Sequence, residues 1–204
     1  MSIIEAVRFH GVNVTPKTNW CFLEVRTADG MTGAGECTLA NQEALLEAEA
    51  GRLAARVAGQ DSRDRNRVAR YLPHAPGGLV TATILSAFEC ALLDLAGQRI
   101  GEPLHRVLGG AIRDPVPLYA NINRGAAPRT PEGFAAAARR AVAEGFQAVK
   151  LAPLEPLVWE DGATPANRAA YAEGLARIAA VRQAVGAEVD VMVDAHWRFS
   201  PGGA

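Results

Sequence analysis

The sequence has few cysteines and no excess of either charge. Its cysteines number three, and they stand far apart at Cys21, Cys37 and Cys90 with no Cys-x-x-Cys pair. An odd, scattered set of thiols argues against a disulfide framework and against a zinc site, so we expect reduced thiols. The formal net charge of −1 leaves no basic surface for nucleic acid or an anionic membrane.

Marks of export and of membrane insertion are also missing. The N-terminus, MSIIEAVRFHG, has no basic start followed by a long apolar block. We find no run that approaches the roughly 18 apolar residues of a membrane span. Hydrophobic residues form 49% of the chain, which is typical of a globular protein with a substantial core. We therefore predict a cytoplasmic protein without a membrane or nucleic-acid partner.

The first segments of the chain predict an antiparallel sheet. Residues 3–14 and 20–28 are rich in apolar and β-branched side chains, which favours extended strands. Asp29-Gly30 follows at once and is the strongest short hairpin signal, so we expect 20–28 to pair with 31–36. Gly33 and Gly35 could suggest a phosphate-binding loop, but no helix opens on the last glycine. Hairpin geometry and close packing explain these glycines better.

Two helices are predicted next, at 41–57 and 79–99, from apolar residues at three- and four-residue spacing. Glu89 and Asp94 stand within the apolar second helix, and we interpret both as structural because a buried acid is more often paired than catalytic. The expected apolar faces consist of Leu45, Leu46, Leu53 and Val57 in the first helix and Leu85, Phe88, Leu92 and Leu95 in the second.

The second half of the chain alternates strands and helices. Thr130-Pro131 and Thr164-Pro165 each combine an N-cap residue with a proline at the first helical position. The alternation predicts parallel strands joined by helical crossovers. The predicted strands are 116–121, 146–151 and 189–194, and the predicted helices are 135–144 and the segment from Thr164 to Gly186, with Tyr171, Leu175, Ile178 and Val185 on its buried face. The apolar run in 189–194 predicts a strand covered on both faces.

Polar residues stand at the ends of the predicted parallel strands. They are Asn121, Asn123 and Arg124 at the first strand, Lys150 at the second, and Asp194 with His196 at the third. The carboxyl ends of parallel strands meet at one edge, where ligands bind, so a carboxylate could ligate a metal beside an imidazole that transfers protons. A plainer interpretation stays open, in which Asp194 caps a turn, His196 is half exposed and Lys150 extends to solvent.

The stretch AFECALLDLAGQRIGEPLHRVLGG, residues 87–110, resembles the helix-and-turn signature of the enolase superfamily, in the mandelate racemase and muconate lactonizing branch. The resemblance covers effectively the whole chain. It implies an α+β capping domain at residues 1–114 and the start of the catalytic barrel at 115–204. The implied fold class is an α+β capping domain followed by the first three strands of a TIM-type (β/α) barrel.

The resemblance also implies roles for the residues at the strand ends. Asp194 matches the first carboxylate ligand of a magnesium ion, Mg²⁺. Lys150 matches the first lysine of the Lys-x-Lys motif, whereas the second position is Ala152, so the second-strand base of the racemases is missing. The motif of Asp194 and His196 resembles that of the acid-sugar dehydratases, of the galactonate type, in which the histidine protonates the departing hydroxyl.

These matches favour a hydro-lyase that dehydrates a sugar acid, a small-molecule carboxylate, to a 2-keto-3-deoxy acid. The alternatives are a racemase, epimerase or cycloisomerase of the same superfamily and, in another class, a non-catalytic capping and dimerisation module. In the family, loops of the capping domain select the substrate. By position the candidate contacts are Lys17, Asn19, Trp20 and Asn41, with Asn123 from the barrel, and Trp159 and Trp197 could pack at its mouth.

The length of the chain leads to one further expectation. A complete barrel takes about 250 residues, whereas only residues 115–204 follow the capping domain. We expect a partial sequence of a longer enzyme, inactive by itself, whose remaining metal ligands and base lie beyond Ala204. The resemblance implies a homo-oligomer for the full-length protein. His10, His74 and His105 are expected at the surface or in packing.

Overall fold

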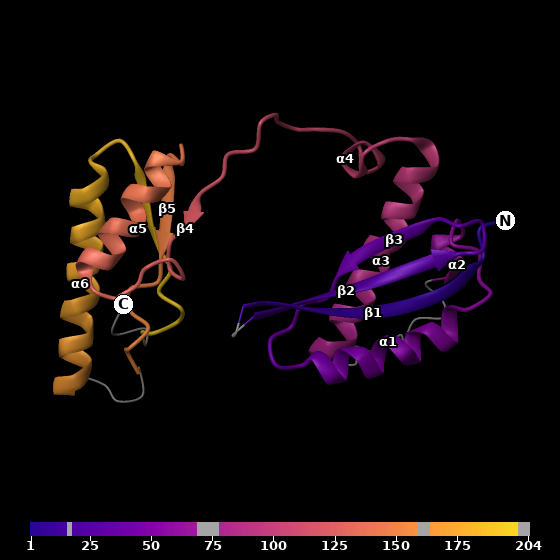
Figure 1. Ribbon diagram of the computed structural model, residues 1–204, viewed down its shortest axis with the longest axis horizontal. Coiled ribbons are helices and arrows are strands. Elements are labelled where there is room, and N and C mark those ends of the chain that lie inside the picture. The colour runs from indigo at the N-terminus through magenta and orange to yellow at the C-terminus, as the bar shows by residue number, and fades with distance from the viewer. Residues whose placement is uncertain (16–17, 69–77, 159–163, 200–204) are drawn as a thin grey trace. The chain divides into compact units, whose positions relative to one another are not determined.

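The structure is a computed structural model and describes residues 1–15, 18–68, 78–158 and 164–199. It consists of two compact units, Met1–Ile112 and Arg113–Ala204 (Figure 1). The boundary predicted from the sequence lies after Asp114. Lys17, His74 and Trp159, about which the sequence led to expectations, fall outside the described residues.

The first unit contains a three-stranded antiparallel sheet in the order β1-β2-β3. β1 spans Ile4–Thr15, β2 spans Thr18–Thr27 and β3 spans Thr32–Glu36. The hairpin predicted between β2 and β3 is confirmed, because the Thr27 N–H donates to the Met31 carbonyl at 3.0 Å. Gly30 makes the turn with φ of 86°, a conformation that costs glycine little.

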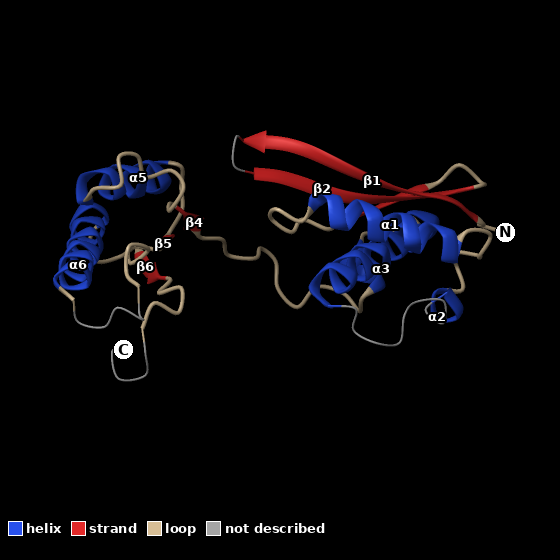
Figure 2. Cartoon of the chain, turned by 90° about the horizontal axis from the view of Figure 1, so that it is seen from below, coloured by secondary structure: helices blue, strands red, loops and turns tan. Residues whose placement is uncertain are grey.

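The four helices described in this unit are α1 (Glu43–Val57), α2 (Arg65–Val68), α3 (Gly78–Ile100) and α4 (Leu104–Val107). Figure 2 shows α1 and α3 on the same face of the sheet. The core between sheet and helices is buried and apolar, and it includes Ile4, Leu23, Val25, Leu46, Leu53, Val57, Phe88, Leu92 and Leu95. Leu45 was expected there but is 55% exposed, because it lies about 100° around the helix from Leu46.

Helix α3 packs directly on β3, and glycines make that approach possible. A Cβ atom on Gly33 or Gly35 would lie under 3.0 Å from a backbone carbonyl oxygen of α3, at Ala91 and Ala87. The close-packing interpretation of these glycines is therefore confirmed. Asp94 of α3 accepts a hydrogen bond from the Ala34 N–H of β3 at 3.0 Å, which confirms its structural role.

By length and composition α3 could cross a membrane, so the expectation that no segment is that apolar was wrong. The expectation counted uninterrupted apolar runs, and α3 carries isolated polar residues within a long apolar stretch. Its apolar side chains pack against β2, β3 and α1. α3 is thus the central core helix of this unit.

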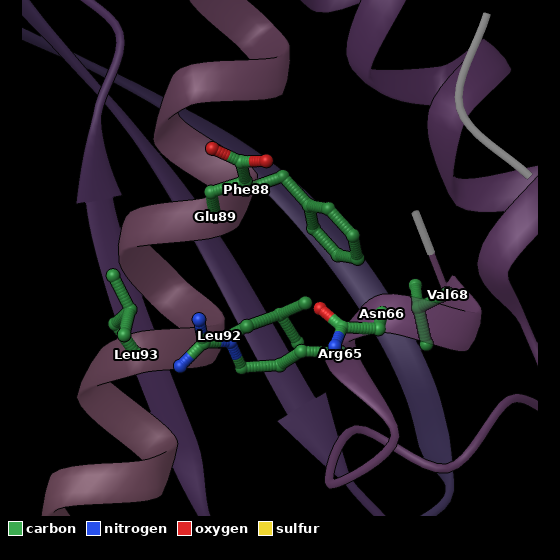
Figure 3. Close-up of a pocket in the computed structure, with 7 residues that line it drawn as sticks. All are labelled: Arg65, Asn66, Val68, Phe88, Glu89, Leu92 and Leu93. Atoms are coloured by element: carbon green, nitrogen blue, oxygen red, sulfur yellow. The ribbon is translucent and has the colours of Figure 1, made fainter. Parts of the chain in front are cut away.

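Glu89 lies on the exposed side of α3. Together with Arg65 of α2 it lines a small pocket of about 130 Å³, which Phe88 and Leu92 also line (Figure 3). The three cysteines are free, with Cys21 and Cys37 buried and Cys90 exposed.

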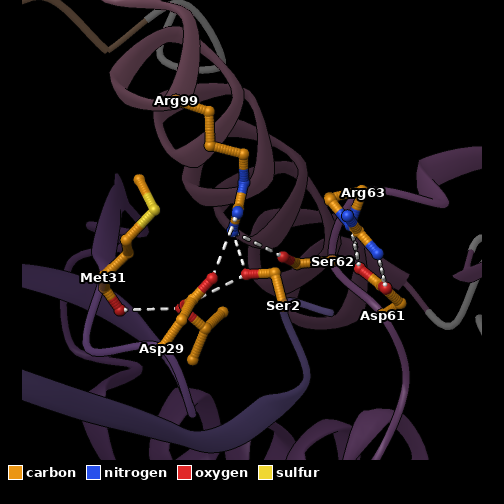
Figure 4. Close-up of polar contacts among 8 residues, drawn as sticks. Ser2, Asp29, Met31, Asp61, Ser62, Arg63 and Arg99 are labelled. Carbon is orange, nitrogen blue, oxygen red and sulfur yellow. Dashed lines mark hydrogen bonds and ion pairs between the residues drawn. The ribbon is translucent and has the colours of Figure 1, made fainter.

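A polar cluster ties the N-terminus to the β2–β3 hairpin (Figure 4). Arg99, at the end of α3, donates to Ser2, to Asp29 at 3.3 Å and to Ser62 at 3.3 Å. Asp29 also accepts from the Thr27 hydroxyl at 2.5 Å and from the Ser2 hydroxyl at 3.2 Å. The Thr27 hydrogen bond, followed by those from Ser2 and Arg99, lowers the pKa of Asp29 to about 2.

We expect this cluster to make the first unit sensitive to acid. A carboxylate whose folded pKa is depressed stabilises the fold above its unfolded pKa, and that stabilisation is lost as the pH falls through the folded pKa. The loss attributable to Asp29 should therefore run from about pH 4 down to about pH 2. Urea midpoints measured across this window should fall less steeply for Asp29→Asn than for the wild type. An unchanged slope in the variant would contradict the assignment.

The second unit contains a three-stranded parallel sheet in the order β4-β5-β6. Its strands are β4 (Ala120–Asn121), β5 (Ala148–Leu151) and β6 (Asp190–Val193), and its helices are α5 (Pro131–Ala143) and α6 (Pro165–Val185). The alternation predicted from the sequence is confirmed. Both predicted caps are present, because the Thr130 hydroxyl accepts from the Gly133 N–H at 3.2 Å and the Thr164 hydroxyl from the Asn167 N–H at 3.3 Å.

Three details of this unit differ from the expectations. β4 is shorter than 116–121, because Val116 and Leu118 are 65% and 73% exposed and pair with no strand among the described residues. β6 is only partly covered, with Val193 43% exposed, because it is an edge strand of the described sheet. On α6, Tyr171 and Leu175 are 44% and 47% exposed. The buried residues of α6 are Asn167, Gly174, Arg177 and Val181.

Candidate active site

The ends of the three parallel strands come together around a small hollow. Asn121 pairs with Lys150, and Lys150 pairs with Met192, so the strand ends are aligned in register. The hollow has a volume of about 280 Å³ and is lined by Asn121, Asn123, Arg124, Lys150, Ala152, Glu155, Asp194 and His196. The structure thus brings together the polar strand-end residues singled out from the sequence.

Asp194 stands at the centre of this group. The Lys150 Nζ donates to Asp194 Oδ2 at 3.2 Å, and the His196 Nε2 lies 3.3 Å from the same oxygen. The side chains of Lys150, Asp194 and His196 are 25%, 34% and 42% exposed, respectively. An ammonium group and an imidazole therefore share one carboxylate at a site that solvent and a small ligand can reach.

The turn after β6 folds His196 back onto Asp194. The Asp194 N–H donates to the Leu151 carbonyl at 2.9 Å, which continues the β5–β6 pairing. Asp194 Oδ1 then accepts the His196 N–H at 3.1 Å. His196 and Trp197 have φ of 47° and 51°, a left-handed conformation that non-glycine residues adopt rarely and that is found near functional sites. Trp197 itself is 92% exposed.

Hydrogen bonds favour the charged forms of both Asp194 and Lys150. The pKa of Asp194 is lowered, chiefly by the hydrogen bond from the His196 N–H and then by that from Lys150. The pKa of Lys150 is raised, chiefly because its ammonium group donates to Asp194. The ring of Tyr119, whose centroid lies 5.6 Å from the Lys150 Nζ, adds a cation–π contact.

The Asn123 side chain, in the wall of the hollow, forms hydrogen bonds with three neighbours. Asn123 Oδ1 accepts the Ala152 N–H at 3.2 Å and Arg129 Nη2 at 3.1 Å, and its Nδ2 donates to Glu155 Oε1 at 2.9 Å. Most of the hydrogen-bonding capacity of this amide is therefore used inside the protein. Arg129 and Glu155 were not predicted from the sequence, because they lie in loops without a periodic pattern or a recognised motif.

Three of the four candidate substrate contacts of the first unit, Asn19, Trp20 and Asn41, are among the described residues and lie near the β1–β2 hairpin and the start of α1. The Asn19 amide accepts from Asn13 at 2.9 Å and donates to Glu43 at 2.9 Å. Trp20 is 50% exposed, and Asn41 is exposed with φ of 61°. Polar and aromatic groups are thus presented at this edge of the unit, and the Asn19 amide is already engaged by its neighbours.

A magnesium ion needs more oxygen ligands than these residues supply. Mg²⁺ prefers octahedral coordination by oxygen atoms, usually with more than one carboxylate or with substrate oxygens. Among residues 1–15, 18–68, 78–158 and 164–199, no group of three or more His, Cys, Asp or Glu side chains could hold a metal ion. Asp194 supplies a single carboxylate, so these residues do not form a magnesium site by themselves.

Two known families match this chain. Residues 9–109 match the family described as Mandelate racemase / muconate lactonizing enzyme, N-terminal domain. Residues 133–204 match the family described as Enolase C-terminal domain-like.

Curated relatives and solved structures agree with these matches. The chain is 40% identical over 124 residues to a D-gluconate dehydratase of Thermoproteus tenax, covering 61% of this chain and 24% of the relative. It is 30% identical over 184 residues to a D-galactonate dehydratase of Ralstonia pickettii (strain 12J), covering 89% of this chain and 46% of the relative. A member of the enolase superfamily from Salmonella Typhimurium superposes with a TM-score of 0.83 at 27% identity, over 98% of this chain and 56% of that one. The chain therefore spans less than half the length of these two curated relatives.

Proposed function

Because the chain belongs to the mandelate racemase and muconate lactonizing enzyme family of the enolase superfamily, we propose that it is part of a hydro-lyase that removes water from a sugar acid. The names of the relatives, D-gluconate dehydratase and D-galactonate dehydratase, support this class of reaction. The product would be a 2-keto-3-deoxy acid. In this proposal the first unit is the capping domain and the second is the beginning of a TIM-type barrel.

The observation that carries the proposal is the cluster of Lys150, Asp194 and His196 at the strand ends. The Lys150 Nζ and the His196 Nε2 lie 3.2 Å and 3.3 Å, respectively, from Asp194 Oδ2. Parallel α/β barrels build their active sites at this end of the sheet. A cation for a substrate carboxylate and an imidazole for proton transfer are therefore presented together, where a small acid can enter.

Each residue has a defined role in the proposed reaction. The Lys150 ammonium group binds the substrate carboxylate and stabilises the negative charge that develops when the adjacent carbon loses its proton. Protonated His196 gives its proton to the hydroxyl on the next carbon, which leaves as water while the carbon–carbon double bond of the enol forms. The enol then tautomerises to the 2-keto acid. Asp194 keeps both cationic groups in place.

Magnesium is the cofactor that we propose on the ground of family membership. When bound, it would supply Lewis-acid stabilisation of the substrate carboxylate. Asp194 would provide one of its ligands. The further ligands, and the base that takes the α-proton, would come from residues of the complete enzyme other than those described above. By the same proposal the chain alone is inactive, and the complete enzyme is a cytoplasmic homo-oligomer.

Ala152 argues against a racemase. A two-base racemisation needs a proton-transfer group on each side of the α-carbon. Ala152, which follows the last residue of β5, is apolar and only 3% exposed. In the proposed reaction His196 is the group in the hollow that donates a proton to the leaving hydroxyl. This combination favours elimination over racemisation.

A screen of the complete enzyme against a panel of sugar acids would test the proposed function. With Mg²⁺ present, we expect a 2-keto acid from at least one acid of the panel, detected as its semicarbazone. Chelation of the metal should abolish this activity, and added Mg²⁺ should restore it. Racemisation or epimerisation without keto acid would overturn the dehydratase assignment, and turnover of no acid in the panel would overturn the substrate class.

A further inference from the structure

The strands β4 and β5 separate at the mouth of the hollow, and a side chain takes over the pairing there. The Ile122 N–H donates to the Lys150 carbonyl at 3.0 Å. In a parallel ladder the next bond would run from the Ala152 N–H to the Ile122 carbonyl. That carbonyl instead accepts from the Ala126 N–H at 3.1 Å, and Asn123 Oδ1 takes the Ala152 N–H at 3.2 Å.

Arg129 closes this arrangement from the other side. Its Nη1 donates to the Asn123 carbonyl at 2.7 Å, and its Nη2 contacts Asn123 Oδ1 at 3.1 Å and the Ala152 carbonyl at 3.4 Å. The same nitrogen forms an ion pair with Glu155 Oε2 at 2.7 Å, while Glu155 Oε1 accepts from Asn123. Both backbone groups of Ala152 are therefore held by the trio of Asn123, Arg129 and Glu155.

The buried ring of Phe134 supports the guanidinium group. The Arg129 Cζ lies 5.1 Å from the ring centroid, and Phe134 is 0% exposed. A planar guanidinium that is stacked on a ring and bound on several edges has little freedom to move. Arg129 thus connects the core of the unit to the backbone at the end of β5, two residues after Lys150.

We propose that Arg129 is a positioning residue of the reaction, which acts through Asn123 and Glu155 to fix the end of β5 and with it the ammonium group of Lys150. The proposal rests on the proposed function. Arg129 does not touch the substrate; it determines where the charge-stabilising group stands. A small displacement of such a group reduces the rate of the chemical step much more than it reduces substrate binding.

The first test is kinetic and uses the complete enzyme. In Arg129→Ala we expect kcat to fall roughly ten- to a hundred-fold, while KM changes less than about threefold. Because the Arg129 side chain is 38% exposed, added methylguanidinium should reach the vacated position and restore part of kcat. Arg139→Ala, which removes an exposed arginine of α5, is the matched control and should behave as the wild type. A rise in KM at constant kcat, or no change at all, would overturn the proposal.

The second test uses the 204-residue chain and does not depend on catalysis. Hydrogen exchange of the Ala152 amide should be at least about tenfold faster in Arg129→Ala, and that of the Val149 amide inside β5 should be unchanged. Glu155→Gln keeps the size of the side chain and should accelerate the same amide, which covers a failure of Arg129→Ala to fold. Unchanged Ala152 exchange in both variants would overturn the proposal. If the wild-type enzyme dehydrates no sugar acid, the proposed function fails, and the exchange result still decides whether the trio holds β5.

Discussion

In His196→Asn, dehydration by the complete enzyme should fall by about 10²- to 10⁴-fold, the usual contribution of a general acid, while exchange of the α-proton continues. The His196 Nε2 lies 3.3 Å from Asp194 Oδ2 at the hollow, where the proposed reaction uses it as the proton donor. Asparagine has no proton to give at neutral pH, so the leaving hydroxyl departs unassisted. In the proposed reaction another group removes the α-proton, so this proton should still exchange with solvent.

The substitution is suited to this question because asparagine tolerates the backbone of the turn. His196 has φ of 47°, and asparagine adopts left-handed conformations more readily than most residues. The measurements are keto acid formation and, in D₂O, loss of the α-proton signal in the NMR spectrum of the substrate. His10→Asn, a half-exposed histidine of β1 that lies 3.5 Å from Glu24, serves as the control. Loss of both elimination and exchange in His196→Asn would show that the role is misassigned.

Phe134→Ala should lower the free energy of unfolding of the second unit by about 3–5 kcal/mol, as for other fully buried phenylalanines. The ring is 0% exposed and contacts two guanidinium groups, with the Cζ atoms of Arg129 and Arg177 at 5.1 Å and 5.6 Å from its centroid. Truncation leaves a cavity and also removes the surface on which both arginines rest. Arg177 is itself only 4% exposed, so the loss of the neighbouring ring should lower the stability of the unit further.

Denaturant unfolding of the 204-residue chain followed by circular dichroism would measure this effect. Tyr171→Ala is the matched control, because it removes an aromatic ring of α6 that is 44% exposed, and it should cost less than about 1 kcal/mol. Equal losses in the two variants would mean that Phe134 is not the centre of this core.

The elements of the fold could be predicted where the signals are local. Asp29-Gly30 specifies the hairpin by its own turn geometry, and Thr130-Pro131 begins α5 by its own cap. The extent of β4 could not be predicted in the same way, because a strand ends where its partner ends. Val116 and Leu118 have strand-like side chains but no neighbouring strand among the described residues.

The buried face of α6 shows a second limit of the sequence pattern. Tyr171 and Leu175 are the larger apolar residues, yet the helix turns Gly174 inward, where a Cβ atom would collide with Leu154. Leu175 is then about 100° away around the helix. Arg177 comes to the inside instead and donates to the Pro153 carbonyl at 2.8 Å. A loop carbonyl that needs a donor cannot be recognised from helical periodicity.

The candidate site could be predicted only in part, for a related reason. Lys150, Asp194 and His196 stand at the ends of strands that are neighbours in a parallel sheet, so topology alone brings them together. Arg129 and Glu155 come from loops, and they meet because of hydrogen bonds that exist only once the unit has folded. Neither residue type nor spacing distinguishes them beforehand from ordinary surface charges.

The paired Thr-Pro starts of α5 and α6 have a consequence for how such a protein can diversify. Each start sets the phase of its helix within the first turn, through a hydroxyl that accepts an N–H three residues ahead. The starting point of each helix therefore does not depend on the sequence of the loop before it. Residues at the strand ends can therefore be substituted, or the loops before the helices lengthened, while α5 and α6 still begin at the same residues. New catalytic residues can then evolve around the hollow while the fold is retained.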